Sequence, residues 1–108
     1  MNEYCMDFLK YLCDRNIHFT VTSAYRTEEQ NAKAGGVMNS QHKRGNALDL
    51  KPYGSTTYSA LLTAFYDYLD YLDQAAVYFD ELITYPTFIH VAFEREGTMG
   101  RAKKIDKR

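Results

Sequence analysis

Two histidines and an aspartate form a set of residues that could bind a metal ion. His42 and Asp49 lie seven positions apart in the stretch SQHKRGNALDL, and His90 follows much later, in FIHVAF. Asp49 is flanked by Leu48 and Leu50, and burying a carboxylate between leucines costs free energy unless a partner compensates its charge. Two imidazoles and one carboxylate are a ligand set typical of a catalytic zinc site with an open fourth position. One zinc ion would supply the partner that Asp49 needs.

Each of these side chains also has an ordinary interpretation, which residue types alone leave open. His42 lies in a polar stretch, where a surface histidine is common. His90 alternates with apolar residues and is also explained as a hydrogen-bonded, half-buried strand residue. His18, the third histidine of the chain, alternates with Thr20 and Thr22, which predicts the exposed face of a strand.

The elements that carry these residues follow from the spacing of apolar side chains. Residues 3–14 repeat them at i, i+3, i+4 and i+7, which predicts an amphipathic helix, and residues 17–22 alternate as a half-buried strand does. A short helix is expected to begin at Thr27 and to stop at the glycine pair 35–36, before a loop at 37–45.

The second half of the chain predicts further elements. NALDLK is expected to form a strand ended by Pro52, and residues 57–75 to form a longer helix with one apolar stripe. Two more extended runs follow, AVYFDELITY and TFIHVAFE. This order predicts an α+β fold, a small antiparallel sheet covered by helices. We expect one domain over residues 1–100 and a solvated basic tail, RAKKIDKR, over 101–108; such a tail could also attract an anionic polymer.

Composition excludes several other classes of protein. The chain has 108 residues and a formal net charge of −1, which argues against a nucleic-acid-binding domain. It has no apolar run long enough to insert into a membrane, and its first residues lack the pattern of a signal peptide. Cys5 and Cys13 are expected on one helix, about 12 Å apart, too far for a disulfide. We expect a monomer, of a localisation that the sequence leaves unknown.

Three motifs together resemble the M15 peptidases, the D-alanyl-D-alanine carboxypeptidase and endolysin family with the Hedgehog/DD-peptidase fold. The family carries an S-G-Y-R-S-like segment, then S-x-H-x(6)-D with a glycine three residues after the histidine, then a W/F-[IV]-H-V strand. Here these read SAYRT at 23–27, SQHKRGNALD at 40–49 and FIHV at 88–91. Their order and spacing match over roughly residues 17–93.

The resemblance implies roles for individual residues. His42, Asp49 and His90 would be the ligands of one zinc ion. Arg26 would grip a carboxylate of the substrate, a task that suits the guanidinium fork, although a surface salt bridge would also explain it. Ser40 would help to shape the substrate pocket.

The residue that transfers protons is where the sequence departs from the family pattern. Zinc hydrolysis needs a base for the bound water, and later an acid for the leaving amine. Family members usually carry an acid three or six residues before the last histidine, where Thr87 and Thr84 stand, or an aspartate two residues after it, where Ala92 stands. Asp80 and Glu81 are the nearest catalytic candidates, in an FDELI segment similar to the family's Phe-Asp-Gln-Leu-Ile. Alternation along a strand would put them on opposite faces, and both could be hydrogen-bonded strand-edge residues.

The expected function is therefore a zinc metallopeptidase that cuts the stem peptide of bacterial peptidoglycan, as a carboxypeptidase or an endopeptidase. By analogy, it would be a lysis protein of a phage or prophage. The alternative is a catalytically impaired, zinc-stabilised module of the same fold that binds the wall or serves in a virion. The absence of an acid close to His90 in the sequence is the argument for this alternative.

Overall fold

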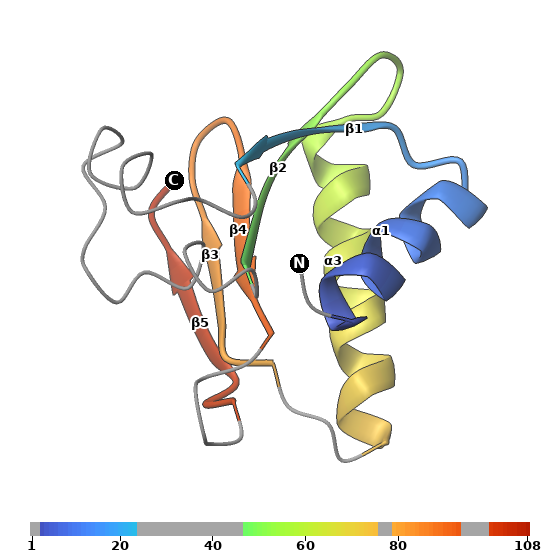
Figure 1. The fold of residues 1–108 in the computed structure, drawn as a ribbon. Coiled ribbons are helices and arrows are strands. Elements are labelled where there is room, and N and C mark those ends of the chain that lie inside the picture. The colour runs from blue at the N-terminus through green and yellow to red at the C-terminus, as the bar shows by residue number, and fades with distance from the viewer. Residues whose placement is uncertain (1–2, 24–46, 76–78, 94–99) are drawn as a thin grey trace, which may run out of the picture.

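A computed structural model describes residues 3–23, 47–75, 79–93 and 100–108 of the chain. These ranges contain two helices and five strands, namely α1 (Glu3–Asp14), β1 (Phe19–Ser23), β2 (Ala47–Pro52), α3 (Tyr58–Gln74), β3 (Glu81–Thr84), β4 (Ile89–Ala92) and β5 (Lys103–Asp106) (Figure 1). The expected short helix from Thr27 and the loop at 37–45 lie outside the described residues.

Both helices form where the apolar spacing predicts them, and each presents one buried stripe. Helix α1 buries Cys5, Phe8 and Leu12, three residues that fall on one side at helical spacing. Helix α3 begins after Thr57, whose hydroxyl oxygen accepts a hydrogen bond from the backbone N–H of Ala60 at 3.0 Å. Neither described helix is long and apolar enough to cross a membrane.

The strands form a single sheet in the order β1-β2-β4-β3-β5. The first four strands pair antiparallel, as expected. Strand β5 pairs parallel with β3, so the sheet is mixed rather than purely antiparallel.

Strand β5 also corrects the expectation of a solvated tail after residue 100. The backbone N–H of Lys103 donates to the carbonyl oxygen of Asp80 at 3.0 Å, and that of Lys107 donates to the carbonyl oxygen of Thr84 at 2.7 Å. The two lysine side chains of the strand are exposed, as is common on an edge strand. The basic composition of residues 101–108 therefore did not indicate the strand, which backbone pairing with β3 holds in place.

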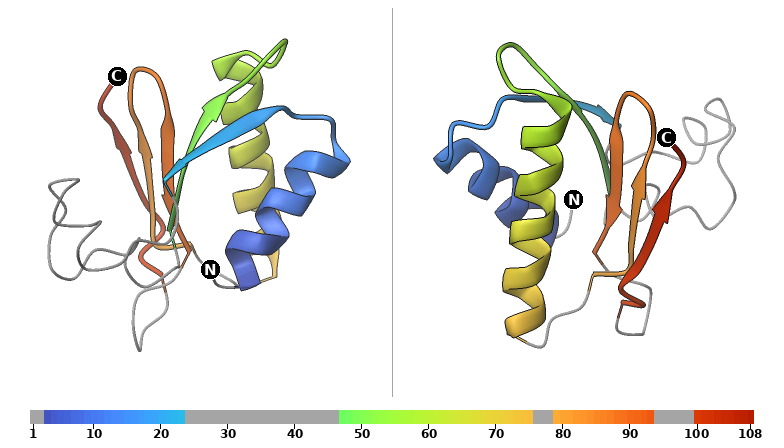
Figure 2. Two further views of the ribbon diagram at one scale, coloured as in Figure 1. Left: turned by 45° about the horizontal axis from the view of Figure 1, so that its top comes forward. Right: turned by 180° about the vertical axis from the view of Figure 1, so that it is seen from behind.

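Both helices cover the same face of the sheet, as the two views of Figure 2 show. Leucine, isoleucine and valine side chains from the three central strands pack there against Phe8 of α1 and Phe65 of α3; they are Leu48, Leu50, Leu82, Ile89 and Val91. The rings of Phe8 and Phe65 meet edge to face, with centroids 4.7 Å apart. Since side chains alternate along a strand, the residues between these apolar ones point to the opposite face.

Candidate metal centre

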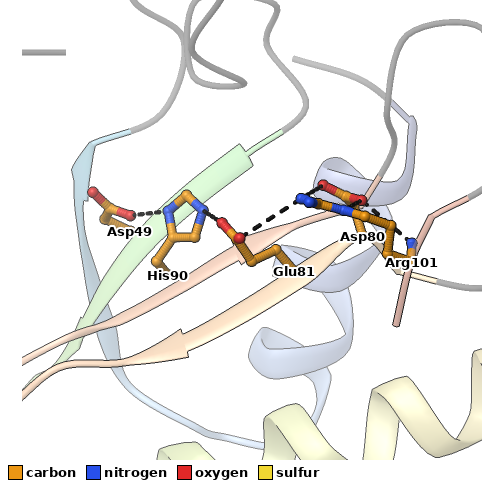
Figure 3. A network of polar contacts seen from close by, with 5 residues as sticks. All are labelled: Asp49, Asp80, Glu81, His90 and Arg101. Carbon is orange, nitrogen blue, oxygen red and sulfur yellow. Dashed lines mark hydrogen bonds and ion pairs between the residues drawn. The ribbon is translucent and has the colours of Figure 1, made fainter. Parts of the chain in front are cut away.

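Asp49 and His90 face each other across two central strands, on the face of the sheet that the helices leave uncovered. They are directly paired residues of the antiparallel strands β2 and β4. The Nδ1 atom of His90 lies 2.8 Å from Oδ1 of Asp49, a hydrogen-bond distance (Figure 3). The side chain of His90 is only 14% exposed and that of Asp49 only 12%. The sheet thus holds a carboxylate and an imidazole together with little access to water.

The apolar neighbours of Asp49 explain how a carboxylate comes to be held here. Leu48 and Leu50 are fully buried in the core beneath the helices, so Asp49 between them must point the other way. The hydroxyl of Thr22 donates to the backbone carbonyl oxygen of Asp49 at 3.2 Å, which adds a link from β1 to this residue. The sequence LDL therefore fixes the direction of the carboxylate through the packing of its neighbours.

Glu81 lies at the other nitrogen of the same imidazole. Its Oε1 atom is 3.7 Å from Nε2 of His90, and its side chain is 19% exposed. Regular alternation along β3 predicts this side of the sheet for Glu81. The imidazole of His90 therefore has one carboxylate at each of its ring nitrogens (Figure 3).

Asp80, the neighbour of Glu81, is fully buried and is paired with Arg101. The guanidinium binds its carboxylate with two parallel hydrogen bonds, Nε to Oδ1 at 2.8 Å and Nη2 to Oδ2 at 3.0 Å. The backbone N–H of Arg101 also donates to Oδ1, at 3.3 Å. Side-chain hydrogen bonding to Asp80 raises the pKa of the Arg101 guanidinium. The pair links the residue that precedes β3 to the segment before β5.

Arg101 also contacts Glu81, the first residue of β3, and thereby joins the carboxylates of two successive residues. Its Nη2 atom lies 3.6 Å from Oε2 of Glu81. The polar groups thus form one continuous row from Asp80 through Arg101, Glu81 and His90 to Asp49 (Figure 3).

Three of the predicted site residues, Arg26, Ser40 and His42, lie outside the described residues. The structure therefore describes two of the three expected metal ligands. Within the described ranges, no group of three or more His, Cys, Asp or Glu residues is arranged to hold a metal ion. His18 is exposed, as its alternation with threonines predicts.

Asp49 and His90 fit a metal ion by their chemistry. A carboxylate oxygen and an imidazole nitrogen are both ligands that zinc accepts, and here they point at each other from two paired strands. A bound cation would also compensate the charge of the buried carboxylate.

The sequence did not predict the contacts of Arg101 with Asp80 and Glu81. A carboxylate inside the apolar run FDELI calls for a cation, but the chain has 13 lysine and arginine residues and no spacing rule selects one of them. Arg101 was expected in a solvated tail. Its proximity depends on the parallel pairing of β5 with β3.

Fold and site together define a small α+β protein with a nitrogen–oxygen ligand pair on one face of its sheet. The family model described as Peptidase M15 matches residues 5–92, a span that includes Asp49 and His90. The chain therefore belongs to the Peptidase M15 family, and this membership indicates a metallopeptidase. No curated protein and no solved structure matches the chain.

Proposed function

We propose that this protein is a zinc-dependent peptidase that hydrolyses a peptide bond in the stem peptide of bacterial peptidoglycan. The observation that carries the proposal is the 2.8 Å contact between His90 and Asp49, two residues of the family's ligand motifs that come from distant parts of the chain. Family membership adds the peptidase class. The two helices over one face of a five-stranded sheet are compatible with the Hedgehog/DD-peptidase arrangement.

In this proposal Asp49 and His90 hold one zinc ion together with His42. When bound, zinc supplies a water of lowered pKa and polarises the scissile carbonyl group. The sheet keeps its two ligands in register, and their burial limits the competition of bulk water for the site. Arg26 would orient the substrate through a carboxylate, and Ser40 would line the substrate pocket.

Proton transfer is the step for which Asp80 and Glu81 are the two candidate acids. Both carboxylate oxygens of Asp80 accept hydrogen bonds from Arg101, which leaves this group poorly suited to take up a proton. Glu81 is less buried and contacts His90, so it is the better candidate of the two. It lies, however, at Nε2 of the ring, whereas Asp49 lies at Nδ1.

This placement favours a second candidate function, a catalytically impaired zinc-stabilised module that binds the cell wall or serves in a virion. A base must reach the water beside the metal ligands. Neither Asp80 nor Glu81 lies on the Nδ1 side of His90, where Asp49 is. A protein of this second kind would bind zinc and cleave nothing.

Incubation of the zinc-loaded protein with purified peptidoglycan separates the two functions. We expect release of products, free D-alanine from a carboxypeptidase or stem-peptide fragments from an endopeptidase. His90→Ala should reduce release to background, whereas His18→Ala, which removes the exposed histidine outside the site, should leave it unchanged. Zinc uptake without release between about pH 5 and 9 would contradict the peptidase and support the non-catalytic module.

A further inference from the structure

We propose that Glu81 is a positioning residue of the metal centre. Its carboxylate, held by Arg101, accepts the Nε2 proton of His90 and thereby keeps Nδ1 directed at the metal. This inference rests on the proposed zinc site, and it assigns Glu81 a task other than that of the catalytic base.

The nitrogen of His90 that would bind the metal is Nδ1. Asp49 and His90 can share one ion only through atoms that face each other, and the ring atom facing Asp49 is Nδ1. A coordinating nitrogen uses its lone pair, so the proton of a neutral imidazole must then sit on the other nitrogen, Nε2.

The Nε2 proton of His90 needs an acceptor. A histidine that binds a metal commonly donates its other ring N–H to a carboxylate or carbonyl group, which fixes the tautomer and raises the basicity of the ligand. Glu81 is the acceptor that the described part of the chain places there, with Oε1 at 3.7 Å from Nε2. A shift of about 1 Å would bring this contact to hydrogen-bond length.

Arg101 holds the carboxylate of Glu81 in place. Arg101 lies within 3.6 Å of Oε2 of Glu81, on the carboxylate oxygen that does not face His90. Arg101 is itself fixed by its two hydrogen bonds to the fully buried Asp80. The segment before β5 therefore contributes to the ligand geometry through Arg101, although it lies outside the ligand motifs.

The zinc dissociation constant, measured by competition with a chromogenic chelator on metal-free protein, tests this inference. Glu81→Ala and the nearly isosteric Glu81→Leu should each weaken zinc binding by about 10- to 100-fold. Glu81→Gln keeps a hydrogen-bond acceptor and should recover part of the loss. The matched control is Glu3→Ala, the same substitution at an exposed position on α1.

Two readouts separate positioning from a general loss of structure. Thermal unfolding of each metal-free variant shows whether it is folded at the temperature of the titration, and Glu81→Leu keeps the test valid if Glu81→Ala does not fold. The ¹⁵N spectrum of the imidazole groups should show His90 of the zinc-loaded wild type protonated at Nε2. Protonation at Nδ1 in the zinc-loaded protein would overturn the inference.

The outcomes also distinguish this inference from the proposed function. A wild type that takes up no zinc overturns both. If the wild type and folded Glu81→Leu bind zinc equally tightly, only the role of Glu81 is overturned. The same holds if Glu81→Gln binds zinc no more tightly than Glu81→Leu. The expected order of affinity is wild type, Glu81→Gln, then Glu81→Leu.

Discussion

Asp49 and His90 are directly opposite residues of neighbouring antiparallel strands, and this register brings the two predicted ligands together. A slip of one residue in either strand would turn one of the two side chains into the core beneath the helices. Leu48 and Leu50 prevent such a slip, because both are fully buried there. The same apolar packing that stabilises the fold therefore also determines the geometry of the site.

The pair of Asp80 and Arg101 should be asymmetric in its effect on stability. Arg101→Ala removes two charge-assisted hydrogen bonds from a fully buried carboxylate and should lower the midpoint of thermal unfolding by about 10 °C or more. Asp80→Asn should lower it less, because the side chain of Arg101 is 40% exposed and can turn to water. Differential scanning calorimetry of both variants gives the comparison.

Arg108 provides the control for Arg101. It pairs with Asp106 at 3.0 Å, but both side chains are largely exposed. Arg108→Ala should therefore change the midpoint little, since exposed ion pairs contribute weakly. An equal loss for Arg108→Ala and Arg101→Ala would show that the burial of Asp80 is not what makes its pair important.

Phe8 should be among the most costly residues of the core to truncate. It is almost fully buried and its ring contacts the rings of Phe65, Tyr68 and Phe93. Phe8→Ala should lower the free energy of unfolding by about 3–5 kcal/mol, measured by urea denaturation. Met6→Ala, an exposed position on the same helix, should change it by less than about 0.5 kcal/mol. Similar losses at both positions would contradict the packing described for α1.

Tyr68 should make the protein less stable at alkaline pH. Burial raises the pKa of Tyr68 to about 12, whereas a tyrosine in an unfolded chain has a pKa of about 10. Between these values the unfolded state binds fewer protons than the folded state, so the free energy of unfolding falls as pH rises from about 10 to 12. Tyr68→Phe removes this group and should make the decline shallower in urea unfolding curves.

Tyr71→Phe is the matched control for Tyr68→Phe. Tyr71 lies on the same helix, and the residue is 64% exposed. If Tyr71→Phe flattens the alkaline decline as much as Tyr68→Phe does, burial of Tyr68 is not its cause.

Hydrophobic spacing predicted most of the described elements. The stripe at 3–14 predicted helix α1, the stripe at 57–75 predicted α3, and NALDLK, at 46–51, covers all of strand β2 except Pro52. These elements are decided by a local pattern, a period of 3.6 or 2 residues. The prediction that they combine in an α+β fold agrees with the structure.

Features that depend on pairing between distant parts of the chain were not predicted from the sequence. Strand β5 is short and mostly exposed, and backbone hydrogen bonds to β3 hold it in place. No pattern of side chains predicts these hydrogen bonds. The contact of Arg101 with Asp80 and Glu81 depends on that pairing and was missed for the same reason. Residue types alone suggested Asp49 and His90 as possible ligands of one ion, and the family motifs made their closeness an expectation.

Elemental analysis of the purified, zinc-equilibrated protein tests the central claim most directly. We predict one zinc ion per chain in the wild type and in His18→Ala, whose exposed side chain lies outside the site. His42→Ala and Asp49→Ala should each lose the ion and, with it, the stabilisation that metal binding contributes to folding. Full zinc occupancy in both His42→Ala and Asp49→Ala would contradict the ligand assignment.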